Sequence, residues 1–216
     1  MERIKQLHTK FEGGLIYFKD SHEILQRIKE TIFSACEDCE LRFSQLFKQL
    51  SQKKNIPVDI KEVYVELNRL AKIMERCKYH KYFDKYAESR RQKLNDFIDS
   101  RKMRSKFQNP GPIKELYEKG SHHLIELLPL CAKLFEEEND LYENIFTEIK
   151  NVKGKFTAIV SGPFQQLTAM IDGIIENTKK HMDVNEILLI TDIFESLAKC
   201  YDKYIALFSV LLIHTQ

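Results

Sequence analysis

The sequence contains no tryptophan, and only seven of its 216 residues are glycine and five are proline. Residues that end or bend regular structure are therefore scarce, which favours long elements with few turns. Apolar residues recur three or four positions apart along most of the chain, and no convincing run alternates with period two. We therefore expect an all-α protein in which helix follows helix through short links, as in antiparallel bundles stacked into an elongated rod.

The chain also lacks a long hydrophobic run. Its most apolar segment, YIALFSVLLI at 204–213, is about half as long as the ~18 residues that a transmembrane helix needs. We expect no membrane span, and we expect this segment to pack against something: either it folds back, or it meets a further layer of helices. The cysteines are scattered through helix-like sequence with no signal peptide, which favours a reduced, cytosolic setting; they are Cys36, Cys39, Cys77, Cys131 and Cys200.

The chain has almost no net charge, although one segment of it is strongly basic. The formal net charge is only +2, so the chain as a whole is not an electrostatic binder of nucleic acid. Residues 78–106 nevertheless contain ten basic and four acidic residues, whereas residues 107–216 contain ten basic and sixteen acidic ones. The basic excess is therefore confined to one segment.

The apolar spacing and the capping signals predict a series of helices. One runs from about Asp20 to Gln52, the next from about Asp59 to Cys77, and a third through residues 78–98 to about Arg104. Later helices are expected at about 130–150, 156–181 and 184–213, the last with Asp183 and Glu186 in capping spacing. Pro129 predicts a kink or a stop near residue 128.

The strongest break in the pattern is FQNPGP at 107–112, because two prolines around a glycine cannot continue a helix. We therefore expect three parts: a first helical bundle at 1–106, a linker at 107–112 and a second helical bundle at 113–216.

Catalytic motifs are absent from the sequence: it has no glycine-rich phosphate loop, no G-x-S-x-G elbow and no H-E-x-x-H. We expect no enzymatic activity, no catalytic residue, no metal site and no cofactor. Cys36 and Cys39 have the spacing of a zinc or redox pair, but a zinc site needs two further ligands, and we interpret both as buried structural thiols. We interpret His122, His123 and the EEEND segment at 136–140 as solvated.

Aromatic and basic residues are interleaved most densely in KYHKYFDKYAESRRQKLNDFI at 78–98. On a helix the residues at steps of three and four form one stripe, so we expect the rings to be buried. Arg90 is a charge inside this stripe, where it should run its stem over apolar surface or hydrogen-bond to a carboxylate or to helix-end carbonyls. The stripe consists of Tyr79, Phe83, Tyr86, Arg90, Leu94 and Phe97, with Lys81, Lys85, Ser89 and Gln92 turned away.

The same stretch resembles the seventy-kilodalton subunit of the exocyst, the complex that tethers secretory vesicles to the plasma membrane. YHKYFDKYAESRRQKLNDFI is similar to that family's pattern of two spaced aromatics, an arginine and a leucine, with Phe83, Tyr86, Arg90 and Leu94 in those places. The segments at 17–47 and 185–208 resemble an earlier and a later helix of the family. The similarity runs through most of the chain.

The resemblance implies a non-enzymatic rod of stacked helical bundles that acts in exocytosis. It implies a cytoplasmic protein, peripherally associated with the plasma membrane and secretory vesicles. The implied partners are other exocyst subunits and Rho- or Ral-type small GTPases. Family members are roughly three times longer, so the chain corresponds to their middle portion. Their coiled-coil segment and their phosphoinositide-binding surface have no counterpart here.

Two alternatives stay open. A peripheral membrane or acidic-ligand module would use the basic segment 93–106, and an enzyme with an unrecognised helical site would be metal-dependent through Cys36 and Cys39. A nucleic-acid partner is not expected, because the rings that would stack on bases are predicted to be buried. The candidate residues for an anionic lipid or acidic partner are Lys93, Arg101, Lys102, Arg104 and Lys106.

Overall fold

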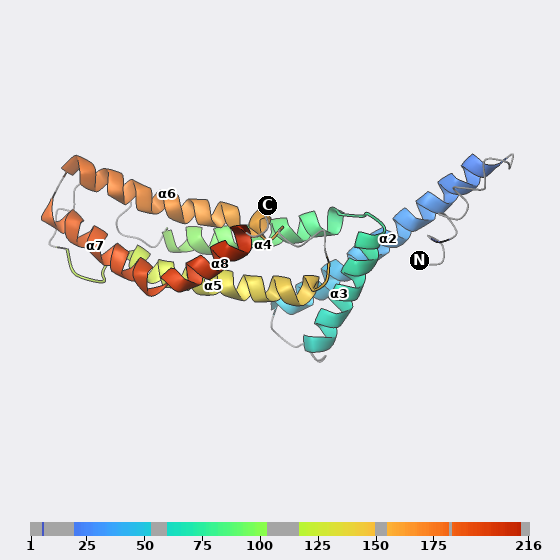
Figure 1. The fold of residues 1–216 in the computed structure, drawn as a ribbon, viewed down its shortest axis with the longest axis horizontal. Helices are drawn as coiled ribbons and strands as arrows, with labels where there is room; N and C mark the ends of the chain where they lie inside the picture. Colours follow the sequence, from blue (N-terminus) through green and yellow to red (C-terminus); the bar gives the residue numbers. More distant parts are fainter. Residues whose placement is uncertain are drawn as a thin grey trace. The chain divides into compact units, whose positions relative to one another are not determined.

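The computed structural model describes residue 6 and residues 20–52, 60–102, 117–149, 155–181 and 183–212, and every regular element within these ranges is a helix (Figure 1). The all-α prediction is therefore confirmed for this part of the chain. The expected breaks at 53–59 and 107–112 lie outside the described residues. The helices are α2 (Ser21–Gln52), α3 (Ile60–Arg76), α4 (Lys81–Lys102), α5 (His123–Phe146), α6 (Thr157–His181), α7 (Val184–Lys199) and α8 (Tyr201–Leu212).

The chain divides into two compact units. Unit 1 comprises residues 1–86 and 143–152, and unit 2 comprises residues 87–142 and 153–216. Each of the long helices α4 and α5 contributes residues to both units. The expected division into 1–106 and 113–216 rests on a linker outside the described residues and stays a prediction, while the compact units divide the chain at other positions.

In unit 1, α2 and α3 pack against each other along an apolar stripe of each helix. The buried side chains of α3 recur at steps of three and four, which explains why this segment forms an amphipathic helix. They are Val63, Leu67, Leu70, Ala71 and Met74. Leu67 and Met74 have no exposed surface, so the centre of this helix pair is fully packed.

The turn between α3 and α4 corrects the expected helix start at residue 78. Lys78 adopts the left-handed conformation with φ 56°, its N–H donates to the Glu75 carbonyl, and the Tyr79 N–H donates to the Met74 carbonyl at 3.0 Å. This is the Schellman pattern that closes a helix. The chain therefore turns at residues 77–80, and α4 begins at Lys81.

In unit 2, the later part of α4 packs with α5, α6, α7 and α8. Side chains join α4 to α6 through Asp99 and Gln166, α6 to α7 through Asn177 and Glu186, and α8 to α5 through the Tyr204 hydroxyl. Figure 1 shows these helices side by side, with successive helices running in opposite directions and α7 followed by α8 in the last position. This is the up-and-down arrangement of a helical bundle.

Pro129 lies inside α5 and does not end it. Of the kink or stop expected near residue 128, the stop is therefore wrong. A proline in a helix leaves the carbonyl four residues earlier without its N–H donor, and that carbonyl belongs to Ile125. The Ser196 hydroxyl of α7 donates to the Ile125 oxygen at 2.9 Å. A hydrogen bond from the neighbouring helix thus replaces the one that proline removes.

Ser196→Ala is expected to lower the free energy of unfolding by about 1 kcal/mol, because the part-buried Ile125 carbonyl then loses its donor. Chemical denaturation measures the change. In a Pro129→Ala background the restored helix N–H satisfies Ile125, so the same serine substitution should cost less there. Equal costs in both backgrounds would contradict this account of Pro129.

The last predicted helix, 184–213, is two helices in the structure. Cys200 separates α7 from α8 with φ −112° and ψ 9°, outside helical geometry, and its N–H donates to the Leu197 carbonyl three residues earlier. Its thiol also donates to the Ser196 carbonyl at 3.1 Å. Asp183 stands at the N-cap of α7 as expected, but its side chain makes no capping hydrogen bond.

None of the described helices is both long enough and apolar enough to cross a lipid bilayer. This agrees with the sequence expectation for the described residues.

Candidate functional site

The helix that carries the family-like motif has the orientation predicted from its spacing. Phe83, Tyr86 and Leu94 are buried, with exposed fractions of 6% or less, whereas Lys81, Lys85, Ser89 and Gln92 are exposed. The prediction missed Tyr82, which is among the largest fully buried side chains. The rings of Tyr82, Phe83 and Tyr86 therefore belong to the protein interior, whereas Phe97, also expected in the buried stripe, is only partly buried.

Within unit 1 the motif rings join an aromatic cluster. Phe146, in the last turn of α5, lies 5.5 Å from the Phe83 ring centroid and 5.0 Å from that of Tyr86, both edge to face. Phe47 of α2 contacts Tyr86 in the same manner at 4.9 Å. Edge-to-face pairs add about 0.5–1.5 kcal/mol each beyond the burial of area. Phe83 and Tyr86 thus pack the start of α4 against the end of α5, and Tyr86 also packs against α2.

Within unit 2 the motif arginine forms a buried ion pair with a carboxylate, which is one of the alternatives that the sequence left open for Arg90. Its Nε donates to both carboxylate oxygens of Glu138 on α5, at 2.7 and 2.9 Å, and its Nη2 also donates to Oε2. The Arg90 side chain is 11% exposed and the Glu138 side chain 2%. Because two nitrogens of one planar guanidinium donate to the same carboxylate, the contact fixes the angle between α4 and α5 as well as their distance.

Glu138 was expected to be solvated as part of EEEND, and that expectation is wrong. Its position continues the buried stripe of α5, in which Cys131, Phe135, Tyr142 and Ile145 recur at steps of three and four. A carboxylate inside an apolar stripe needs a cationic partner, and Arg90 was the corresponding charge in the stripe of α4. Matching these two charges would have found the pair from the sequence.

A second carboxylate is buried in unit 1. Glu40 of α2 is 6% exposed and accepts hydrogen bonds from the Tyr79 hydroxyl and the Lys85 ammonium. Burial alone would raise the pKa of Glu40, but these two hydrogen bonds outweigh it and leave the pKa below its usual range. The carboxylate therefore stays charged and ties α2 to the start of α4.

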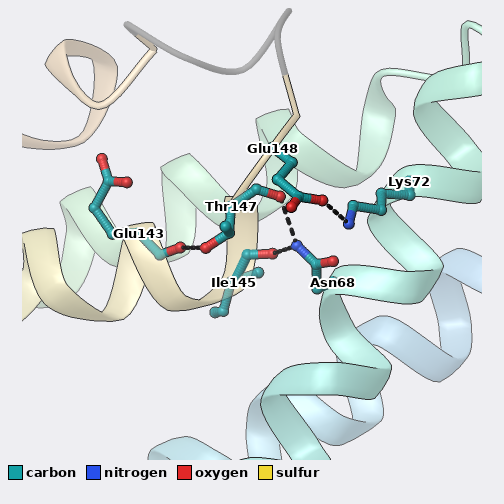
Figure 2. A network of polar contacts seen from close by, with 6 residues as sticks. All are labelled: Asn68, Lys72, Glu143, Ile145, Thr147 and Glu148. Carbon is teal, nitrogen blue, oxygen red and sulfur yellow. Dashed lines mark hydrogen bonds and ion pairs between the residues drawn. The ribbon is translucent and has the colours of Figure 1, made fainter.

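The C-terminal end of α5 is capped by a side chain of α3, as Figure 2 shows. Asn68 Nδ2 donates to the Ile145 and Thr147 carbonyls, each at 2.9 Å, and Lys72 donates to Glu148 at 2.7 Å. The last carbonyls of a helix have no partner within it, and a neighbouring amide supplies one here. Glu148, at φ 67°, turns the chain away after these bonds.

Asn68→Ala is expected to lower the free energy of unfolding by about 1–2 kcal/mol, because two helix-end carbonyls lose their donor. Lys72→Ala removes only the exposed ion pair with Glu148 in the same junction and should cost less. Thermal unfolding of the two variants would show the difference. If both lose the same stability, the amide is not the capping group.

The predicted basic patch is only partly described. Lys93 is exposed on α4, and the Arg101 guanidinium lies over the Phe97 ring at 5.4 Å. The Lys102 side chain, Arg104 and Lys106 lie outside the described residues. A patch that binds anionic lipid or an acidic partner stays a prediction.

His122 and His123 are not solvated, which corrects the sequence interpretation. His122 is 5% exposed, and its Nδ1 accepts the Leu124 N–H at 3.3 Å in the manner of an N-cap. Burial lowers the pKa of His122 to about 4, with a smaller effect from His123, and burial also lowers the pKa of His123. Both rings border a pocket of about 250 Å³ with Arg101, Glu126 and Leu130.

Segment 117–120 is hydrogen-bonded to α7, a contact that no sequence pattern predicted. Asp192 accepts hydrogen bonds from the Tyr117 hydroxyl and the Gly120 N–H, both at 2.6 Å. Burial favours a raised pKa for Asp192, and these hydrogen bonds overcome it and lower the pKa. Lys119 adds an exposed ion pair with Glu195 at 2.8 Å.

Of the two cysteines spaced as a metal pair, Cys36 is buried as expected and Cys39 is partly exposed. Burial raises the pKa of the Cys39 thiol, and Cys77 adds to that effect. Within the ranges that the structure describes, no group of three or more histidine, cysteine or acidic side chains could hold a metal ion. The side chains described above are arranged to join helices.

Comparison with known proteins adds no relative to this picture. No family model, no curated protein and no solved structure matches the chain.

Proposed function

We propose that this chain is a non-enzymatic scaffold segment of an exocyst-type subunit that tethers secretory vesicles to the plasma membrane in exocytosis. One observation carries the proposal. The four residues that resemble the family's motif all serve helix packing: Phe83, Tyr86 and Leu94 are buried, and Arg90 forms the buried pair with Glu138. A motif with this role is what a helical tether requires.

The mechanism would be mechanical. In this proposal the chain is part of an elongated rod of stacked antiparallel bundles, and the rod holds separate binding surfaces apart. Buried pairs such as Arg90–Glu138 suit this task, because a multidentate contact resists rotation of one helix against another.

The proposed partners are sibling exocyst subunits, with Rho- or Ral-type small GTPases docking on exposed helix faces. The proposed location is the cytoplasmic side of the plasma membrane and of secretory vesicles, where the protein associates peripherally. Phosphoinositide binding is assigned to parts of the family that lie outside this chain.

Affinity purification of the tagged chain from cells of the organism that encodes it, followed by mass spectrometry, tests the proposal. We expect sibling exocyst subunits to be recovered with the chain. Arg90→Ala is the test variant: it breaks the motif pair and should reduce the recovery of sibling subunits if the folded helices carry the contacts. A folded chain that recovers none of these subunits would refute the assignment.

A further inference from the structure

The largest set of exposed apolar side chains in the described structure lies on α7 and α8. Six large apolar residues there are between 47% and 67% exposed. On α7 four of them recur at helical steps along one face, with the exposed Thr191 and Ala198 between or beside them, and the other two lie one turn apart on α8. We call this set the α7–α8 stripe; it comprises Val184, Ile187, Leu188, Phe194, Tyr201 and Ile205.

The stripe is not a by-product of loose packing. The opposite face of the same helices is buried against the rest of unit 2, with Leu189, Ile193 and Tyr204 each no more than 8% exposed. Ser196 and Tyr204 are hydrogen-bonded to α5 carbonyls on that inner face. α7 and α8 are thus apolar on two sides, and among the residues that the structure describes only one of these sides is covered.

The area of the stripe is suited to a second helix face of the same size. About half of two aromatic and four aliphatic side chains amounts to roughly 500 Å² of apolar surface in each copy. Two such faces together would remove about 1,000 Å² from water, which is the lower limit for a specific interface, before the flanking residues are counted. A patch of this size on an isolated chain marks an interaction site.

Charges at the edge of the stripe favour a second copy over a lipid surface. The exposed charges beside the stripe alternate in sign along α7 and α8, in the order Glu195, Lys199, Asp202 and Lys203, so this edge has no net positive charge to attract anionic lipid. An antiparallel two-fold arrangement brings the same edge of both stripes together. Glu195 of each copy can then face Lys199 of the other, so the edge is complementary to itself.

We propose that the α7–α8 stripe is the interface of a homodimer, in which two copies of this chain pack their stripes antiparallel about a two-fold axis. The occupant of the face is a second copy of the chain. This inference does not depend on the tethering function.

The mass in solution is the first test. Light scattering coupled to size-exclusion chromatography should give twice the chain mass of 25.6 kDa at micromolar concentrations and approach the chain mass on dilution. Phe194→Glu should raise the dissociation constant of the dimer by about 30-fold or more, as expected for a central aromatic at an interface. The melting temperature of the dissociated chain should stay unchanged, because the Phe194 side chain is already 55% exposed.

Val65→Glu is the matched control, since Val65 is 68% exposed on α3 and gains the same charge. It should leave the dimer intact. A wild-type chain that stays monomeric at about 100 μM, or a dimer that Phe194→Glu does not weaken, would overturn the proposal.

Charge exchange tests the antiparallel register. Glu195→Lys and Lys199→Glu should each weaken the dimer, and the double variant should restore it, because opposite charges then face each other again. Lys119→Ala controls for the ion pair that Glu195 makes within its own chain, and it should leave dimerisation unchanged. Failure of the double variant to recover would refute the two-fold pairing of Glu195 with Lys199.

Discussion

Replacing Arg90 by alanine is expected to lower the free energy of unfolding by about 3–5 kcal/mol, because Glu138 is then left as an uncompensated charge in the interior. The Glu138 side chain is only 2% exposed, so water cannot replace the guanidinium without opening the bundle. Urea denaturation followed by circular dichroism measures the loss. Glu138→Ala should cost a similar amount for the same reason.

The pair should also show strong coupling. In Arg90→Met/Glu138→Leu, both charges are gone and apolar groups fill the space, so the double variant should be more stable than either alanine variant. Lys179→Ala serves as the control in the same unit, because Lys179 and Glu176 form an exposed pair with 67% and 60% of their side chains accessible; little change is expected there. Additive losses in the Arg90 and Glu138 variants would show that the two residues act independently.

The contrast between Arg90 and Glu138 shows how far the sequence could predict the site. Arg90 was recognised because it interrupts a stripe of aromatic rings, where a charge needs a partner. Glu138 was missed because it stands in a run of acidic residues, and the run was read as a unit although its members point in different directions. Glu136, two positions earlier, is indeed exposed and pairs with Lys203. Position on the helix face, rather than local composition, decides burial.

Helix existence was predictable, whereas several helix ends were not. The end of α3 was predicted at about Cys77, one residue beyond Arg76. The break at Cys200 was not predicted, because it depends on a backbone turn at a residue other than glycine, so the usual stop signal is missing. At Pro129 a stop signal is present but the helix continues, because Ser196 of a distant helix supplies the lost hydrogen bond. Such tertiary compensation cannot be deduced from the residues around the proline.

The buried histidine at the start of α5 leads to the second large effect, a loss of stability in mild acid. The pKa of His122 falls from 6.5 to about 4 in the folded protein, because burial disfavours the charged ring. Above pH 6.5 the ring is neutral in both states and does not influence folding. As the pH falls from 6.5 to about 4, the unfolded chain binds a proton that the folded chain does not, so folding stability decreases.

The expected decrease is about 3 kcal/mol across this interval, at roughly 1.4 kcal/mol for each pH unit. His122→Asn removes the titration but retains an acceptor for the Leu124 N–H, so the cap at this position is kept. Urea denaturation of wild type and variant between pH 7 and 4.5 should give a difference in unfolding free energy that shrinks as the pH falls. Carboxylates such as Asp192 titrate in both proteins, and their contribution cancels in this comparison. His181→Asn, at an exposed position on α6, should preserve the wild-type dependence. If His122→Asn follows the wild-type curve throughout, the ring is charged or hydrated in the folded chain, and α5 does not begin with a buried neutral histidine.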